Sequence, residues 1–138
     1  MSGPPASSLT PELGVVDAAV SRRFYCDVLG FTVVYERAEE GFLYLRYEGC
    51  ELMLDQIGLG RTWITFELQR PLGRGMNLQF VVSTIDPLLE RLQAAGVAQF
   101  LPVETRTYMA NGVGLRQRQF VVQDPDGYLL RFAERAKG

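Results

Sequence analysis

Hydrophobic and polar residues alternate in short runs along most of the chain, and turn-forming residues separate these runs. Alternation with a period of two is typical of a β-strand that buries one face. Between Asp17 and Gly30 the apolar residues recur at helical spacing instead, so Asp17 is predicted as a helix N-cap and Gly30 as the helix end. The first half therefore predicts a helix over residues 18–29 and strands over residues 9–16, 31–37, 41–47 and 51–56.

The second half of the chain repeats this order of elements. Asp86 is predicted as the N-cap of its helix, Pro87 as the first helical residue and Gly96 as the residue that ends it. Gly49 precedes a strand in the first half as Gly127 does in the second, and these landmarks indicate an internal repeat about 55 residues long. The strands predicted here span residues 76–83, 98–104, 114–123 and 128–133.

Two βαβββ modules of this kind predict an α+β fold. Placed side by side, they would form a curled, mostly antiparallel sheet with the helices outside. The predicted divisions are a disordered tail at 1–8, a first module at 9–57, a connector at 58–75 and a second module at 76–135, all within one structural domain. The concave face of such a sheet is the natural place for a ligand. The alternative is a ferredoxin-like or other α+β sandwich without a cavity.

The composition fits a compact globular domain and narrows the possible partners. The chain has 138 residues, 47% of them hydrophobic and 22% charged, with a net charge of −2. This balance offers no basic face for nucleic acid. No run of residues is long and apolar enough for a membrane span. With only two cysteines and no signal-like N-terminus, we expect a cytoplasmic protein with reduced thiols.

Strand parity predicts which side chains face the concave surface, because successive residues of a strand point to opposite faces. If Leu130 and Phe132 pack against the helix, Arg131 faces the concave side. Most of the side chains predicted on the concave face are polar. Buried polar groups need partners, which can be water, a ligand, another subunit or one another, as Arg131 with Glu51 or Asp55. Thr10, Val121 and Leu129 also fall on this side, and the predicted site residues on it are Glu12, Glu51, Met53, Asp55, Asn77, Gln79, Gln117, Gln119 and Arg131.

The chain contains no histidine, and this limits the chemistry that we expect. A serine or cysteine nucleophile normally needs a general base within hydrogen-bond reach, so no catalytic nucleophile is predicted. A carboxylate pair acting as acid and base stays open for Glu12, Glu51 or Asp55, although no spacing selects it.

Two motifs carry a resemblance to a known family. The Asp124-Pro125-Asp126-Gly127 turn before a strand, together with the Phe-Tyr-Cys-Asp-Val-Leu-Gly-Phe stretch at 24–31, resembles the glyoxalase, bleomycin-resistance and extradiol-dioxygenase superfamily, known as the vicinal oxygen chelate fold. The resemblance covers about residues 9 to 135. It is closest to the bleomycin-resistance proteins, which implies a homodimer with an exchanged N-terminal strand.

The metal-binding positions of this superfamily match Thr10, Met53, Asn77 and Arg131, and none of these is a histidine or a carboxylate. We therefore expect neither a metal nor another cofactor.

The function that the resemblance implies is small-molecule binding, with resistance to bleomycin-type antibiotics by sequestration rather than turnover. Tyr44, Trp63 and Tyr108 would supply aromatic surfaces for such a drug, and the carboxylates would bind its cationic tail. Since Arg131 would oppose a cation, an anionic or neutral aromatic metabolite is an alternative ligand. A glyoxalase- or dioxygenase-like enzyme, either a lyase or an oxidoreductase, is the alternative function, and a sensor or accessory domain is a third.

Overall fold

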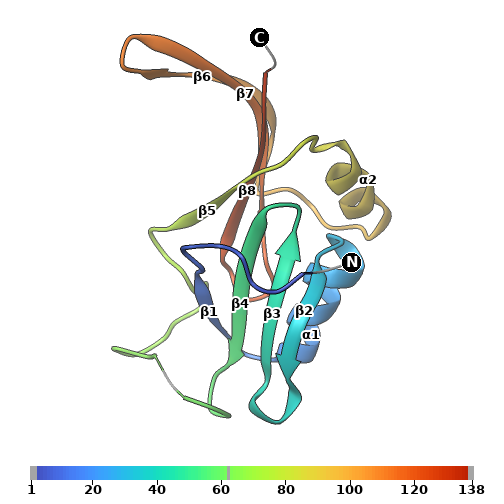
Figure 1. The fold of residues 1–138 in the computed structure, drawn as a ribbon, viewed down its shortest axis with the longest axis vertical. Coiled ribbons are helices and arrows are strands. Elements are labelled where there is room, and N and C mark those ends of the chain that lie inside the picture. Colours follow the sequence, from blue (N-terminus) through green and yellow to red (C-terminus); the bar gives the residue numbers. More distant parts are fainter. Residues whose placement is uncertain (1–2, 62, 137–138) are drawn as a thin grey trace. The chain divides into compact units, whose positions relative to one another are not determined.

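The computed structural model describes residues 3–61 and 63–136 (Figure 1). The chain divides into two compact units, Met1–Leu72, here called unit 1, and Gly73–Gly138, here called unit 2. Each unit has the order βαβββ and forms one four-stranded sheet, in which the first strand is parallel to the last and the other pairs are antiparallel. The α+β class and the two repeated modules are confirmed.

Unit 1 has the sheet order β1-β4-β3-β2. Its first helix, α1 (Ala18–Arg22), continues into a π-helical segment, η1 (Arg23–Val28), and a 3-10 turn, η2 (Ala38–Glu40), connects two strands. Helix α1 contacts β3 and β4 and lies beside the sheet (Figure 1). The strands are β1 (Glu12–Val15), β2 (Thr32–Arg37), β3 (Phe42–Tyr47) and β4 (Cys50–Gln56).

The ends of the first helix follow the prediction, but its second half is wider than an α-helix. The Asp17 side chain accepts the Ala19 N–H at 2.9 Å, and Gly30 ends the helix with a φ of 94°. Between them the Leu29 N–H donates to the Phe24 carbonyl at 3.0 Å, which closes a π-helical turn. This turn buries Phe24 and Leu29 in the core of unit 1.

Unit 2 has the sheet order β5-β8-β7-β6, and its helix is α2 (Asp86–Ala94). Its core includes the stacked rings of Phe80, Phe120 and Phe132, with centroids 4.9 Å apart for Phe80–Phe132 and 5.6 Å for Phe120–Phe132. The strands are β5 (Asn77–Val81), β6 (Leu101–Ala110), β7 (Val113–Gln123) and β8 (Leu129–Arg135).

The predicted N-cap of the second helix is wrong by one residue. Ile85 is the N-cap, and Asp86 is already helical. The Ile85 N–H donates to the Glu134 carboxylate at 2.9 Å and the Asp86 N–H to the Thr84 hydroxyl at 3.3 Å. The Asp86 carboxylate instead binds Arg118 at 2.8 Å. A side chain from β8 therefore performs part of the capping that we expected from Asp86.

Strands β6 and β7 form a long hairpin that bends away from β8 toward its tip (Figure 1). Asn111 and Gly112 make the turn, with φ values of 52° and 78°, as a two-residue hairpin turn requires. Strand β6 continues to Ala110, six residues past the predicted end at 104.

The Asp124-Pro125-Asp126-Gly127 segment forms the predicted turn before the last strand. One oxygen of the Asp124 carboxyl accepts the N–H groups of Asp126, Gly127 and Tyr128, each at 2.9 Å. Gly73 lies against the ring of Tyr128, because a Cβ at that glycine would stand 2.3 Å from the Tyr128 Cδ1 atom.

The N-terminal segment makes defined contacts with unit 1. The Arg46 guanidinium donates to the carbonyls of Gly3 and Pro4 at 3.0 and 2.6 Å, and the N–H groups of Ala6 and Ser7 donate to Glu51. These contacts involve residues that the sequence assigns to a tail. Among the helices of the described residues, none has the length and apolar character needed to cross a membrane.

Candidate functional site

The predicted site residues of unit 1 lie on one face of its sheet, except for Trp63. Met53 is opposite both Glu12 on β1 and Tyr44 on β3, and Glu51 and Asp55 lie two residues away from it on β4. Trp63 follows the last strand of unit 1, and its side chain is 60% exposed.

Glu51 is a buried anion with several hydrogen-bond donors around it. Its side chain accepts hydrogen bonds from the Tyr44 hydroxyl at 2.6 Å and from the Arg46 Nε at 2.8 Å, besides those from Ala6 and Ser7. Burial alone would raise the pKa of this carboxyl, but these hydrogen bonds lower the pKa to about 2. Glu51 is therefore ionised and saturated, and it orders the face rather than offering a free ligand group.

Glu12 and Asp55 form a second kind of carboxyl site, because they hydrogen-bond to each other. Burial and the charge of Asp55 raise the pKa of Glu12, which also bonds to Trp63. Burial and the charge of Glu40 raise the pKa of Asp55. Both carboxyls therefore keep their protons to a higher pH than isolated ones do, and in such a pair the protonated member can donate to a ligand while the ionised member accepts.

Aromatic rings extend this face toward β2. The rings of Tyr35 and Tyr44 stack with centroids 5.2 Å apart, and Phe42 lies 5.7 Å from Tyr35. The Arg37 guanidinium stands 4.1 Å from the centroid of Phe42, a cation–π contact. Tyr35, Phe42 and Arg37 were not among the predicted site residues, although their alternation within the predicted strands 31–37 and 41–47 was a usable signal.

Unit 2 brings several of its predicted site residues together around one pocket of about 270 Å³. All four strands of the sheet contribute to it. Arg131 and Gln79 are opposite each other on β8 and β5, and Gln117 on β7 is opposite Arg135 on β8. The lining residues are Gln79, Tyr108, Leu115, Gln117, Arg131 and Arg135.

A chain of hydrogen bonds orders the amides beside this pocket. The Gln117 Nε2 donates to Gln79 at 3.1 Å and to Gln119 at 2.6 Å. The Gln119 Nε2 donates to the Glu104 carboxylate at 2.9 Å and to the Tyr108 hydroxyl at 2.7 Å. Gln117 and Gln119 are 5% and 3% exposed, so the network replaces the water that these amides lose.

One predicted residue of unit 2 lies outside the pocket, and two residues at or beside the pocket were not predicted. Asn77 is exposed at the start of β5, opposite Leu129, and does not line the pocket of Arg131. Arg135 and Glu104 were not selected, although Arg135 has the strand parity of Arg131 and only lies beyond the predicted strand end at 133. The Arg131 Nε atom is buried and has no hydrogen-bond partner among the residues that the structure describes.

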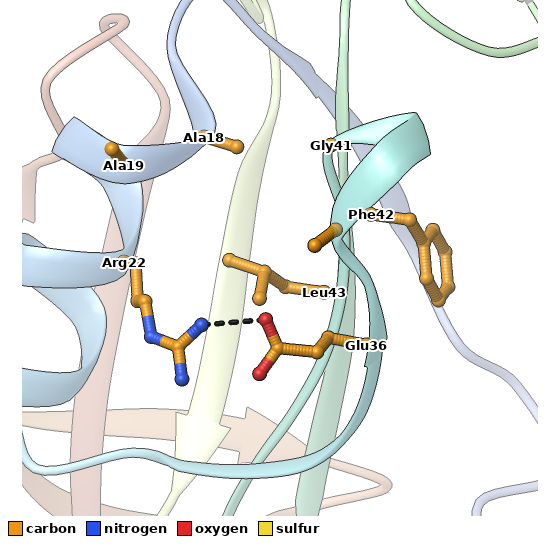
Figure 2. A pocket seen from close by; sticks show the side chains of 8 residues that line it. Ala18, Ala19, Arg22, Glu36, Gly41, Phe42 and Leu43 are labelled. Carbon is orange, nitrogen blue, oxygen red and sulfur yellow. Dashed lines mark hydrogen bonds and ion pairs between the residues drawn. The ribbon is translucent and has the colours of Figure 1, made fainter.

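A smaller pocket of about 190 Å³ lies in unit 1 between α1 and the strands β2 and β3 (Figure 2). Arg22 and Glu36 form an ion pair across it at 2.6 Å. Figure 2 shows Leu43 pointing into this pocket and the ring of Phe42 pointing away from it. Its two charged groups already neutralise each other, so it offers a ligand less than the pocket of unit 2 does.

The residues at the superfamily's metal positions do not fit a divalent cation. Thr10 bonds to the Tyr44 hydroxyl at 3.2 Å, and Arg131 brings a fixed positive charge with an orphaned donor. Hard divalent ions take oxygen ligands, and transition ions take imidazole or thiolate as well. Within residues 3–61 and 63–136, no three His, Cys, Asp or Glu side chains are grouped to hold a metal.

The family model described as "Glyoxalase/Bleomycin resistance protein/Dioxygenase superfamily" matches residues 9–132. A solved member of that superfamily from Vibrio splendidus 12B01 is 40% identical, with 91% of this chain and 95% of that chain covered and a TM-score of 0.42. A search of curated proteins found no match.

Two further solved structures are similar at lower identity. An integron cassette protein from V. cholerae is 26% identical, with 94% of this chain and 96% of that chain covered and a TM-score of 0.68. A virulence protein from Salmonella typhimurium is 24% identical, with coverage of 96% and 98% and a TM-score of 0.67, and this likeness concerns the fold alone.

Proposed function

The chain belongs to the glyoxalase/bleomycin resistance protein/dioxygenase superfamily, and from this premise we propose that it binds an aromatic small molecule reversibly and releases it unchanged. The candidate ligand is a cationic antibiotic of the bleomycin type, so the biological effect would be drug resistance by sequestration. Members of the superfamily bind small molecules, and the proposal concerns which kind of molecule this chain takes.

The observation that carries the proposal is the aromatic and acidic face of unit 1. Tyr35 is exposed on one side and stacks on Tyr44 on the other, so a planar ligand ring could continue the stack. The carboxyls of Glu12 and Asp55, on the same face, would attract the cationic tail of the drug.

Fluorescence of Trp63, the only tryptophan, offers a direct test. Metal-free and copper-loaded bleomycin would be titrated into the protein, and mass spectrometry would examine the drug afterwards. We expect saturable quenching with intact drug. Trp63→Ala should weaken binding measured by calorimetry while leaving the melting temperature nearly unchanged, because the side chain is mostly exposed.

A matched pair of variants locates the binding surface. Tyr35→Ala removes the exposed ring of the stack and should weaken drug binding about tenfold, as the loss of one aromatic contact does. Phe66→Ala removes a ring that is 82% exposed and belongs to no strand of this sheet, and it should leave the affinity unchanged. Equal affinities of the two variants, or no quenching of the wild-type protein, would count against the proposal.

The Glu12–Asp55 pair favours one second candidate function, an enzyme of the lyase or oxidoreductase kind. Raised pKa values suit a general acid–base pair, because one member stays protonated closer to neutral pH. The test is conversion of small aromatic or carbonyl metabolites, followed by mass spectrometry. Turnover that Asp55→Asn abolishes and Glu36→Gln preserves would support the enzyme; its absence across the panel would leave binding as the function.

We also propose that the protein forms a homodimer, as its resemblance to the bleomycin-resistance proteins implies. The tip region of the β6–β7 hairpin supports this, because Met109 and Val113 are 70% and 61% exposed. Apolar surface of this kind is common at subunit contacts. Sedimentation equilibrium should give twice the mass of one chain, and a monomer at micromolar concentration would exclude a stable dimer.

A further inference from the structure

We propose that the pocket in unit 2, here called the arginine pocket, binds the carboxylate group of a small organic acid. This goes beyond the proposed function, which rests on the aromatic and acidic face of unit 1. Four observations lead to it: the charge of the lining, an orphaned guanidinium donor, the direction of the hydrogen-bond chain and the shape of the walls.

The lining of the arginine pocket carries positive charge only. Arg131 and Arg135 both line it, and none of its six described lining residues is acidic. The Arg131 Nε is buried without a hydrogen-bond partner among the described residues. Leaving a buried charged donor unpaired is costly, so such a group usually has an unseen anion or water as its partner. Two guanidinium groups at one cavity favour an anion over water.

Glu104 sets the direction of the hydrogen-bond chain beside the pocket. An ionised carboxylate only accepts, so Gln119 must present its amino group to Glu104, as its Nε2 does at 2.9 Å. The Gln119 carbonyl is then left to accept from the Gln117 Nε2 at 2.6 Å. One acidic residue thus orients both buried glutamines, and Glu104 acts as a positioning residue.

With the amides oriented in this way, hydrogen-bond donors remain at both ends of the series of hydrogen bonds, at Tyr108 and at Gln79. Tyr108 accepts from Gln119, so its own O–H remains available to donate. Gln79 accepts from Gln117 through its carbonyl, so its amino group remains available too. Both residues line the pocket beside the two arginines. Among the described residues, the groups that Arg131, Arg135, Tyr108 and Gln79 leave for a ligand are therefore donors, which is the arrangement that recognises an oxyanion.

The geometry favours a carboxylate on a small apolar body. A guanidinium fork matches the planar carboxylate with two parallel hydrogen bonds. Leu115 and the ring of Tyr108 supply apolar wall for the remainder of the ligand. A volume of about 270 Å³ lies near the lower end of the range for small-molecule pockets, so the ligand is a compact acid.

Benzoate is a suitable probe, because it joins a carboxylate to a flat apolar ring. The full chain, labelled with ¹⁵N, would be titrated with benzoate while the arginine Nε–H signals are followed by NMR. Arg131→Lys identifies the Arg131 signal by its disappearance. We expect a saturable shift of that signal, and affinity about tenfold or more weaker for benzamide, which has the same shape without the charge. Equal effects of benzoate and benzamide would overturn the proposal.

Variants decide whether the arginine pocket is responsible. Arg131→Gln and Arg135→Gln should each weaken benzoate binding about tenfold or more. Arg116→Gln is the matched control, because Arg116 lies on β7 with the opposite parity to Gln117 and does not line the pocket. Should Arg131→Gln fail to fold, the exposed Arg135 still decides the question. Arg135→Gln binding as well as Arg116→Gln would refute the assignment.

Inorganic phosphate separates a carboxylate site from a phosphate site. Phosphate should compete only weakly with benzoate, because the apolar wall then contributes nothing. Displacement of benzoate by phosphate at lower concentration would overturn the assignment to a carboxylate. The result is independent of the antibiotic titration, because Tyr35→Ala in unit 1 should bind benzoate like the wild-type protein.

Discussion

Arg46 and Glu51 lie directly opposite each other on β3 and β4, with 2.6 Å between the Arg46 Nη2 and the Glu51 Oε2. The same arginine holds the carbonyls of Gly3 and Pro4, and the same glutamate holds the N–H groups of Ala6 and Ser7. This pair therefore binds the N-terminal segment to the sheet, because Arg46 donates hydrogen bonds to its carbonyls and Glu51 accepts them from its N–H groups. Both side chains are mostly buried, so the pair orders the polar face from below rather than offering free groups to a ligand.

Replacing Glu51 by glutamine should destabilise the protein. Arg46 would lose its buried carboxylate partner, and such losses cost on the order of 3 kcal/mol in unfolding free energy. Urea denaturation at pH 7 measures the loss. Glu36→Gln, which breaks an exposed ion pair with Arg22, is the control and should cost less than about 1 kcal/mol. Similar losses for the two variants would contradict the structural role of Glu51.

The stabilisation by Glu51 should also depend on pH. Its pKa in the folded protein, about 2, lies below the usual value of 4.5, so the folded state favours the ionised form. The contribution is fully present above the usual pKa and is lost as the pH falls toward 2. The difference in stability between the wild-type protein and Glu51→Gln should therefore shrink between pH 5 and pH 2, and a constant difference would show that the pKa is not lowered.

Asp55→Asn should have the opposite effect and stabilise the protein at pH 7. Burial and the charge of Glu40 raise the pKa of Asp55, so its ionisation opposes folding, and this penalty grows as the pH rises above 3.8. We expect a gain of about 1 kcal/mol at neutral pH, and a smaller gain in acid. Thermal melts across pH 4–8 check this. Asp27 is exposed, so Asp27→Asn should change the stability little. A loss of stability in Asp55→Asn would show that the ionised Asp55 does not oppose folding.

Gly73→Ala should destabilise unit 2 for two reasons. The residue has a φ of 73°, and an added Cβ would meet the Tyr128 ring at 2.3 Å. Gly75 is a control for the first reason alone, because its φ is 87° and a Cβ there would meet nothing within 4 Å. Gly75→Ala should cost about 1 kcal/mol and Gly73→Ala about 1–3 kcal/mol more. Equal costs in urea denaturation would argue against the close approach to Tyr128.

Asp124→Ala should loosen the turn before β8. Three backbone N–H groups lose their common acceptor, and leaving them unpaired should cost about 1–3 kcal/mol. Asp124→Asn keeps a carbonyl oxygen at the same place and should cost clearly less. Hydrogen exchange of the Gly127 and Tyr128 amides reports directly on the turn. Unchanged exchange protection of these two amides in Asp124→Ala would mean that the hydrogen bonds to Asp124 do not stabilise the turn.

Short-range chemistry explains which parts of the fold could be predicted. The cap at Asp17, the helix end at Gly30 and the Asp124–Gly127 turn each depend on residues within a few positions of one another. The second half of β6 has no such signal. Its side chains are mostly exposed on both faces, so residues 105–110 show no buried alternation, and pairing with the backbone of β7 makes them a strand.

In the first helix, burial differs from what helical spacing predicts, and the helix contains a π-turn. Helical spacing predicts that Val20 and Phe24 share a buried face, but Val20 is exposed and the neighbouring Ser21 is buried. The π-turn closed by Phe24 and Leu29 shifts the face that follows it. No local feature of the sequence marks that wider turn, which is accompanied by edge-to-face contacts of Tyr25 with Phe24 and Phe31.

For the candidate site, strand parity was informative wherever the strand ends were right. It grouped Gln79, Gln117 and Arg131, which the structure places around one pocket. It did not reach Arg135, because the predicted strand ended at 133. The contact of Ala6 and Ser7 with Glu51 had no local signal at all, since some forty positions of chain separate the partners.

The two units share one plan of strands, yet their polar faces carry opposite charge. Glu12 is opposite Met53 in unit 1 as Gln79 is opposite Arg131 in unit 2, so an acid in one repeat corresponds to an amide in the other. The ligand charge that each unit favours is therefore set by a few corresponding positions in the two repeated units. An arginine at position 53 or a glutamate at position 79 should therefore change the ligand charge that the respective unit prefers, while its backbone fold stays the same.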